Sequence, residues 1–329
     1  MADKAPFVEA VKEHLTLFPD APTLTIAKMI VDKYPHFNID NVRSSIRYYR
    51  GSAGAERKAK AMRNNPQFIR PWDGKFAVKP VNISTEDYIF NQKKPLILSD
   101  IHLPYHDIDA ISVALEKGYK DGVDSLYLNG DILDFYQASR FTKDGGAMSV
   151  KEERDMFWEF IGWLKSNFSV PIYFKAGNHE ERLEKYVNEK SPELAQLPEL
   201  NLKNFLKLDE HKITYIEGRQ KAIMGKLIVV HGHEFGESIF SPVNPARGLF
   251  LRAKSSTLAG HNHQTSEHHE NNLRNDSMAC FSTGCLCQLT PKYRPFAYTK
   301  WNHGFAIVEI DGDGSFEVNN YRIIDGKVR

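Results

Sequence analysis

Five short polar clusters along this chain carry side chains of the kind that bind metal ions, and an apolar run precedes each of them. Their oxygen and nitrogen atoms suit hard-to-borderline divalent metals. Each cluster alone is weak evidence, because Gly-Asp and Gly-Asn pairs are common in turns. Together, and in this order, they indicate one metal site. The clusters are Asp100-Ile-His102, Gly130-Asp131-Ile-Leu-Asp134, Gly177-Asn178-His179-Glu180, His231-Gly-His233 and Gly260-His261-Asn262-His263.

The apolar runs ahead of the clusters predict buried strands that bring these side chains together. Strand ends in an α/β sheet share one edge, so residues far apart in sequence converge there. Seven donor side chains are then available, which suffice for two ions once water molecules complete the coordination. They are Asp100, His102, Asp131, Asn178, His231, His261 and His263. Two cations roughly 3.5–4 Å apart form a clamp for in-line displacement at phosphorus. The predicted strands are residues 95–99, 125–129, 170–174, 227–230 and 256–259.

The predicted strands alternate with helical stretches at residues 108–119, 149–168 and 180–190. This alternation predicts an α/β domain of layered helices and sheets over residues 94–329. Beyond Ser277 the pattern becomes strand-rich, and the tetrapeptide 311–314 (Asp-Gly-Asp-Gly) predicts the turn of a closing hairpin.

Residues 1–52 predict a separate, all-helical module. Apolar residues recur at helical spacing, and Pro35 interrupts them. Asn38 or Asp40 is placed to cap a third helix that stops at Gly51. Three short helices with tight connections resemble a helix-turn-helix module. Residues 53–93, whose first part is rich in Gly, Ala, Lys, Asn and Pro, predict a linker.

The N-terminal part of the chain is basic, with a net charge of +5 over residues 1–70 against −4 over the remainder. Arg43, Arg47 and Arg50 share one face of the predicted third helix. Such a face suits successive phosphates of DNA or RNA. The alternative is an ordinary solvated face on a small helical cap, which this charge difference does not exclude.

The overall composition is that of an ordinary globular protein. The 329 residues suffice for one large domain and one small domain. No run of about 18 apolar residues predicts a membrane span, and the first residues lack the pattern of a signal peptide. Three cysteines argue against a disulfide framework, so we expect a cytoplasmic protein. The sequence does not indicate an oligomeric state.

The five clusters as a set resemble the motifs of the calcineurin-like metallophosphoesterase superfamily. That pattern reads D-x-H, G-D-x-x-D, G-N-H-[DE], a histidine in an H-x-H context and G-H-x-H, and all five parts are present. The resemblance covers about residues 94–329. It implies a four-layer α/β/β/α sandwich with two divalent metal ions at the strand ends. Manganese is the preferred metal, with iron, zinc or nickel as alternatives.

The resemblance also implies a role for each residue of the site. His179 looks like the non-ligand histidine that protonates the leaving oxygen or contacts the phosphate, so His179 and Asp131 are the expected catalytic residues. Asp134 and Glu180 are expected to orient the ligands. His233 is either a neighbour of a ligand or a structural residue. One ion is expected to receive Asp100, His102, His263 and the shared Asp131, and the other Asp131, Asn178, His231 and His261.

The chain departs from the protein Ser/Thr phosphatase subgroup of that superfamily. Phe135 and Ala176 stand where that subgroup has arginines that grip a phosphomonoester, and Leu103 replaces a glycine. The chain looks nearer to the phosphodiesterase and nuclease branches, and its layout resembles phage-encoded members, which would place it in the cytoplasm of a host cell.

We therefore expect a metal-dependent phosphodiesterase or nuclease that acts on nucleic acid or nucleotides by attack of a metal-bridging hydroxide. Two alternatives are a phosphomonoesterase and a nucleic-acid-binding protein with a vestigial site.

Other residues near the clusters keep two interpretations. The segment 104–107 either lines the substrate mouth or forms a turn in which Asp107 caps the next helix. Three arginines either contact the phosphate or form surface ion pairs, namely Arg140, Arg182 and Arg247. The three cysteines lack a fourth metal ligand at a useful spacing, so buried thiols are expected at Cys280, Cys285 and Cys287. His268 and His269 are expected to be solvated.

Overall fold

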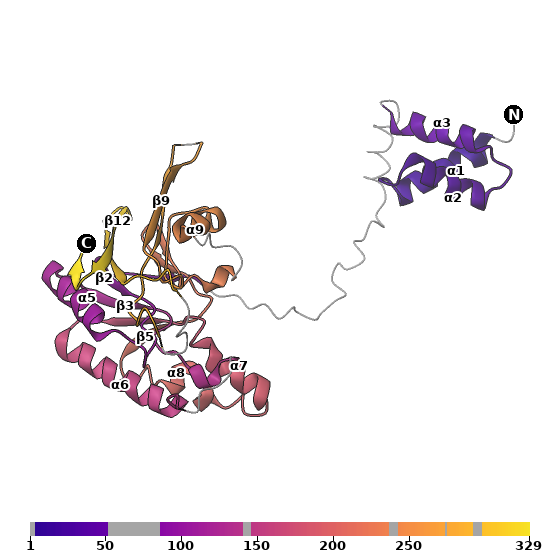
Figure 1. The fold of residues 1–329 in the computed structure, drawn as a ribbon. Coiled ribbons are helices and arrows are strands. Elements are labelled where there is room, and N and C mark those ends of the chain that lie inside the picture. The colour runs from indigo at the N-terminus through magenta and orange to yellow at the C-terminus, as the bar shows by residue number, and fades with distance from the viewer. Residues whose placement is uncertain (1–3, 52–85, 141–145, 237–242, 274, 292–297) are drawn as a thin grey trace. The chain divides into compact units, whose positions relative to one another are not determined.

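A computed structural model describes residues 4–51, 86–140, 146–236, 243–273, 275–291 and 298–329 (Figure 1). The chain divides into two compact units, Met1–Asn82 and Ile83–Arg329. Most of the predicted linker, residues 53–93, lies outside the described residues. Its last part includes strand β1 (Tyr88–Ile89), which pairs with a sheet of the second unit, so the folded part of that unit begins before residue 94.

The first unit consists, in its described part, of three helices: α1 (Lys4–Leu17), α2 (Thr23–Lys33) and α3 (Ile39–Arg50). Asn38 caps α3, because its side chain accepts hydrogen bonds from the backbone N–H groups of Asp40 and Asn41, and Gly51 ends the helix. The predicted cap and stop are therefore confirmed. The apolar faces meet in a small core that contains Val11, Ile26, Ile30, Val42 and Ile46. The helix-turn-helix assignment stays a prediction.

Arg50 has a structural role in this unit. Its guanidinium donates hydrogen bonds to Thr23 Oγ1 at 3.0 Å and to the backbone oxygen of Pro19 at 3.1 Å, and also bonds the backbone oxygen of Ala21. These contacts tie the end of α3 to the connection between α1 and α2. The sequence placed Arg50 with Arg43 among possible phosphate contacts, but the guanidinium of Arg50 is used in hydrogen bonds within the helical unit.

The second unit contains two sheets within the described residues. The seven-stranded sheet has the order β13 (Lys327–Val328), β12 (Phe316–Ile324), β11 (Gly304–Ile310), β2 (Pro95–Leu98), β3 (Ser125–Asn129), β4 (Ile172–Lys175) and β5 (Ile213–Ile216). The six-stranded sheet has the order β1, β6 (Ala222–Met224), β7 (Leu227–Val229), β8 (Thr257–Ala259), β10 (Ser277–Ser282) and β9 (Ser266–Asn271). Strands β2 to β5 run parallel, as do β7 and β8, so their carboxyl ends lie at common edges.

Successive strand residues face opposite sides, and this alternation builds the layers. Leu96 and Leu98 pack in a core with residues of α5 (Ile108–Asp121) and α6 (Val150–Asn167). Ile97 packs in a second core with residues of the six-stranded sheet. The other face of that sheet packs on α9 (Pro245–Ala253) through Leu249. Figure 1 shows α5 and α6 along one sheet and α9 beside β9. The predicted four-layer α/β/β/α sandwich is confirmed.

The predicted helices and hairpin are confirmed, with ends shifted by one or two residues. Asp107 caps α5 through a hydrogen bond from Ala110 N, and Ser149 and Glu152 form a capping box at α6. Strands β11 and β12 form the predicted hairpin. The remaining helical segments are α7 (Glu181–Lys190), α8 (Leu202–Phe205) and the 3₁₀ turns η1 (Tyr136–Ala138), η2 (Pro198–Leu200) and η3 (His233–Phe235). No helix in the described ranges has both the length and the apolar character needed to cross a bilayer.

Candidate metal centre

The seven residues predicted as metal ligands lie in loops that follow five strands of the two sheets. Strands β2, β3 and β4 of the seven-stranded sheet lead to the first three clusters, and β7 and β8 of the six-stranded sheet lead to the last two. Backbone hydrogen bonds join these loops: Asp100 N donates to Gly130 O at 3.1 Å, and Gly260 N donates to His231 O at 2.9 Å. The folding of both sheets thus brings together residues separated by more than 160 positions.

An inner group of predicted ligands, Asp100, His102 and His263, is buried, with no member more than 5% exposed. Asp100 Oδ2 accepts hydrogen bonds from Ser99 Oγ and from His261 N. Its other oxygen, Oδ1, is buried without a hydrogen-bond partner and lies 3.1 Å from His263 Nε2. His102 Nε2 and His263 Nε2 face each other at 3.2 Å. An orphaned carboxylate oxygen beside two converging imidazole nitrogens is the donor set that a divalent cation fits.

An outer group of predicted ligands, Asn178, His231 and His261, is more accessible, because Asn178 and His261 are partly exposed. His231 Nε2 lies 3.3 Å from Asn178 Oδ1. Ring nitrogens of His231 and His261 and a carboxylate oxygen of Asp131 lie within 4.8 Å of one another. Neutral amide oxygen, imidazole and carboxylate again form a mixed donor set for a divalent ion.

Asp131 lies between the two groups. Its Oδ2 is 3.3 Å from His231 Nε2 in the outer group and 3.9 Å from His102 Nε2 in the inner group. Its Oδ1 accepts a hydrogen bond from the backbone N–H of His179 at 2.9 Å. The carboxylate is therefore held at a position from which it reaches both ligand groups.

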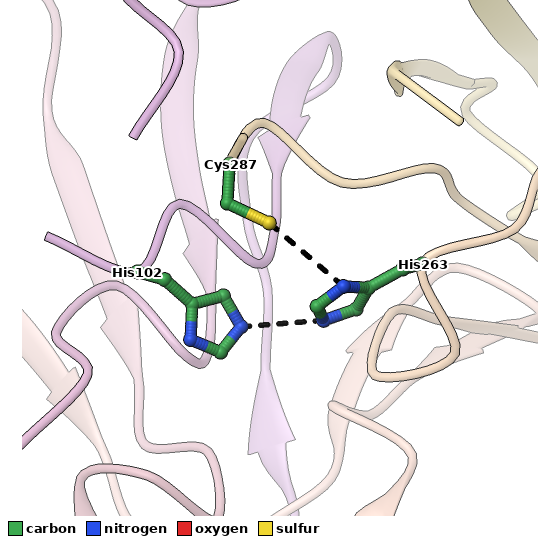
Figure 2. A group of neighbouring side chains, drawn as sticks. All are labelled: His102, His263 and Cys287. Atoms are coloured by element: carbon green, nitrogen blue, oxygen red, sulfur yellow. Dashed lines mark hydrogen bonds between the residues drawn. The ribbon is translucent and has the colours of Figure 1, made fainter. Parts of the chain in front are cut away.

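The three buried imidazoles are oriented by contacts at their Nδ1 atoms. His102 Nδ1 lies 3.0 Å from Asp134 Oδ1, and His231 Nδ1 lies 2.7 Å from the backbone oxygen of Asn129. These acceptors hold a ring hydrogen on Nδ1, so Nε2 is the nitrogen that is available to a metal ion. Figure 2 shows the third case: the thiol of Cys287 is 3.8 Å from His263 Nδ1, and its sulfur also lies within 4.8 Å of a ring nitrogen of His102.

The backbone at the centre is unusual. Five of the predicted ligands have positive φ angles, a region that residues with a side chain rarely adopt. Such strain persists only where the surrounding structure enforces it, and it clusters at functional sites. Here it turns side chains of successive loop residues toward one place. The angles are 56° at Asp100, 51° at His102, 53° at Asp131, 67° at His261 and 56° at His263.

Two glycines leave room for these side chains. A Cβ at Gly130, whose φ is 82°, would overlap the ring of His231, and a Cβ at Gly177 would overlap Asp131 Oδ1. Close approach therefore requires a glycine at both positions, and at Gly130 the positive φ angle favours glycine as well.

Glu180 and Asp134 hold the loops of the centre, as the sequence predicted for them. The buried carboxylate of Glu180 accepts hydrogen bonds from the backbone N–H groups of Asp131, Leu133 and Gly177 at 2.7–3.0 Å. It thus joins the loop after β3 to the loop after β4. Asp134 Oδ1 lies 3.0 Å from Nδ1 of His102 and 3.0 Å from Nδ1 of His179, so one oxygen orients both rings.

An ion pair between a buried lysine and a partly exposed glutamate, which the sequence did not reveal, supports the loop after β7. Lys175, at the end of β4, lies 3.0 Å from Glu234 Oε1. Glu234 in turn accepts hydrogen bonds from the backbone N–H groups of His231 and Gly232, at 3.2 and 2.6 Å. Burial acts to raise the pKa of Glu234, but the charges of Lys175 and His233 lower it to about 2. Lys175 sits inside a run that reads as an ordinary strand, so no sequence pattern marks it.

The carboxylates and imidazoles of the centre perturb one another strongly. Burial by itself lowers the pKa of His231 and His263, but the facing carboxylates of Asp131 and Asp100 raise each of them to about 10. Burial and the neighbouring charge of His231 lower the pKa of His261 to about 4. Burial acts to raise the pKa of Asp100 and Asp131, yet the histidine charges hold both below their usual range. Protons here neutralise a cluster of carboxylates, a task that bound cations would take over.

His179 and Arg182 stand at the partly exposed side of the centre. His179 Nε2 is 3.8 Å from Asp131 Oδ2, and Arg182 Nη2 lies 2.8 Å from the same Nε2. Because a guanidinium only donates, Nε2 of His179 accepts, and the ring hydrogen is assigned to Nδ1, beside Asp134. Arg182 also donates to the backbone oxygen of Asp134 at 2.7 Å.

The other candidate residues take mostly structural places. His233 Nε2 pairs with Glu181 Oε1 at 3.0 Å, while its ring centre is 5.3 Å from that of His231. His268 and His269 pair with glutamates on β9, a mostly exposed strand. Cys280, Cys285 and Cys287 are buried and unpaired, as predicted, but the sequence missed that Cys287 borders a ligand, because no metal-binding spacing marks it.

A family comparison identifies the fold. The family model described as calcineurin-like phosphoesterase matches residues 93–285. The chain belongs to this family. The family predicted from the five clusters is therefore confirmed, and with it a phosphoester hydrolase of a family that uses divalent metals.

The relatives of this phosphoesterase include phage proteins. The Gene 54 protein of Mycobacterium phage L5 is 24% identical over 230 residues, which are 67% of this chain and 90% of the relative. The Gene 54 protein of Mycobacterium phage D29 is 23% identical over 231 residues with the same coverage.

Similar solved structures include Vacuolar Protein Sorting 29 from Cryptosporidium parvum (13% identity, 72% of this chain and 95% of that one, TM-score 0.39). A dimetal phosphatase from Danio rerio is also similar (11% identity, 70% and 96%, TM-score 0.36). Scores this low add nothing to the family assignment.

Proposed function

We propose that this phosphoesterase is a two-metal phosphodiesterase that acts on nucleic acid or nucleotides. The observation that carries the proposal is the position of Asp131, whose Oδ2 lies 3.3 Å from a histidine of the outer group and 3.9 Å from one of the inner group. A carboxylate between two donor sets is the arrangement that a two-ion site needs. The inner group would hold one ion and the outer group the other, and Asp131 would serve both. Manganese is the first candidate for both positions.

Two bound divalent ions would supply the positive charge that activates a water and stabilises the phosphoryl transition state. The chain's own residues would do the rest. Glu180 and Asp134 hold the loops in place before substrate arrives, so the donor set needs no rearrangement. His179, which lies beside Asp131 and is oriented by Asp134, is placed to protonate the leaving oxygen or to contact the phosphate.

A phosphodiester substrate is favoured by two side chains. Phe135 and Ala176 occupy positions at which the protein Ser/Thr phosphatases carry arginines, and a diester carries one negative charge fewer than a monoester. One observation favours the second candidate, a phosphomonoesterase: Arg182 brings a guanidinium to His179 at 2.8 Å from a different position in the sequence.

The test is turnover by protein shown by elemental analysis to hold two metal ions. We expect bis-p-nitrophenyl phosphate and labelled DNA or RNA to be hydrolysed with manganese, faster than p-nitrophenyl phosphate. Faster cleavage of p-nitrophenyl phosphate would instead establish the phosphomonoesterase. No turnover of any of these by the loaded protein would refute both.

We further infer that the first unit delivers nucleic acid to this site. The inference is supported by the net charge of +5 over residues 1–70 and by Arg43 and Arg47 on α3. In the full chain, the double variant Arg43→Glu and Arg47→Glu should weaken binding of labelled DNA or RNA and reduce its salt dependence. Hydrolysis of bis-p-nitrophenyl phosphate should not change. Unchanged nucleic-acid affinity would contradict the inference.

A further inference from the structure

Arg182 lies in the first turn of α7, directly after the loop that carries Asn178 and His179. Its side chain is 18% exposed, so it is neither buried in the core nor free on the surface. Nη1 donates to the backbone oxygen of Asp134 and lies 3.5 Å from Asp134 Oδ2, and Nη2 contacts His179 Nε2. These contacts fix the guanidinium at the open side of the centre.

The guanidinium of Arg182 and the carboxylate of Asp131 both lie close to Nε2 of His179. Arg182 Nη2 is 2.8 Å from His179 Nε2, and that nitrogen is 3.8 Å from Asp131 Oδ2. A phosphoryl group held by ions on either side of Asp131 would therefore approach this same corner.

At this corner Arg182 offers the hydrogen atoms that an anionic oxygen needs. With its hydrogen on Nδ1, His179 presents only an acceptor at Nε2. Arginine stays charged and presents a planar fork of donors that matches two phosphoryl oxygens. The nearby carboxylates, Asp131 and Asp134, repel such an oxygen, so the favourable partner is the guanidinium.

We propose that Arg182 binds the substrate phosphate at this site, an inference that rests on the proposed function. A nonbridging phosphoryl oxygen replaces His179 Nε2 as the partner of Nη2, while Nη1 remains on the backbone oxygen of Asp134. Phe135 and Ala176 stand where the protein Ser/Thr phosphatases carry arginines and provide no positive charge. Arg182 supplies that charge from a different position in the sequence. The same exchange frees Nε2 of His179 to take up a proton from solvent, which it can then give to the leaving oxygen.

The experiment measures binding of inorganic phosphate to metal-loaded protein by calorimetry, with KM and kcat for the two nitrophenyl substrates alongside. Arg182→Met keeps much of the side-chain bulk without charge, and Arg182→Lys keeps the charge without the fork. The matched control is Arg154→Met on α6. Arg154 is 23% exposed, pairs with Asp155 at 2.8 Å and stacks over Trp158, so its loss tests the general cost of removing a helix arginine.

We expect Arg182→Met to weaken phosphate binding about 10–100-fold and to raise KM, with metal content unchanged and partial recovery in Arg182→Lys. The control should bind phosphate as the wild type does. The proposal is overturned if Arg182→Met binds phosphate normally, or if the loaded wild type binds none. Arginine-dependent phosphate binding without turnover of any ester would support this proposal and refute the proposed function, so the two failures are distinguishable.

Discussion

The two ligand groups of the centre differ in their surroundings. The inner group is enclosed by neighbouring side chains. The thiol of Cys287 is 3.8 Å from His263 Nδ1, and the centre of the Trp301 ring lies 4.2 Å from the centre of the same imidazole. The outer group is open to the surface at Asn178 and His261, which are partly exposed. Under the proposed two-ion function, we expect the buried inner group to retain its ion more tightly than the partly exposed outer group. Asp131 lies between the two groups.

The largest effect is expected at this shared residue. Asp131→Asn removes the carboxylate that serves both groups, so metal content should fall from two ions toward none and hydrolysis should fall to background. Elemental analysis after gel filtration and a bis-p-nitrophenyl phosphate assay check this. Retention of two ions by the variant would show that the groups are independent of each other.

Removing the histidine on the open side should separate chemistry from metal binding. His179→Ala leaves every predicted ligand in place, so both ions should remain while kcat falls by about 10²–10⁴-fold. The same two measurements apply. Loss of an ion with kcat per ion preserved would make His179 a ligand and would redraw the outer group.

Metal removal should distinguish the inner from the outer group directly. Because the inner ligands are buried, a chelator should strip the ions in two phases, the outer ion first. His261→Ala should abolish the fast phase and His263→Ala the slow one, as followed by a colorimetric metal indicator. A single phase in the wild type would mean that the difference in burial does not control metal release.

A smaller effect is expected at Glu153, which holds the loop after β3. Glu153 is buried and accepts a hydrogen bond from Phe135 N, next to Asp134. Burial raises the pKa of Glu153 to about 8 from a usual value of 4.5. The folded state therefore binds this proton more tightly than the unfolded state. The resulting stabilisation is complete below pH 4.5 and is lost as the pH rises toward 8.

Glu153→Gln removes this titration, since the amide oxygen still accepts the hydrogen bond. Relative to the wild type, the variant should gain a few kcal/mol of unfolding free energy between pH 5 and pH 8.5, because one pKa unit corresponds to about 1.4 kcal/mol. Urea denaturation at both pH values measures the difference. An equal effect of the substitution at both values would contradict the raised pKa.

The sequence predicted the strands and helices of the fold and many of the residues at which they end. Apolar runs located strands such as β2 and β3, and polar residues directly after them located the predicted ligands, because parallel strands share an edge. Local chemistry located caps such as Asn38 and Asp107, since a cap depends on residues within one turn.

The remaining features depend on contacts between distant segments. The sequence placed Arg50 on a phosphate-binding face, yet the turn between α1 and α2 takes its guanidinium. Cys287 contacts His263 from 24 residues away in the sequence, and Lys175 of the seven-stranded sheet pairs with Glu234, which follows a strand of the six-stranded sheet. No periodicity or spacing records such pairs, so only the three-dimensional structure reveals them.

The central claim is that two ions share Asp131 between the inner and outer groups. Anomalous X-ray diffraction from manganese-loaded crystals at the manganese edge tests it most directly. We expect two peaks roughly 3.5–4 Å apart, one beside Asp100, His102 and His263 and the other beside Asn178, His231 and His261. A single peak, or two peaks that do not both contact the Asp131 carboxylate, would contradict it.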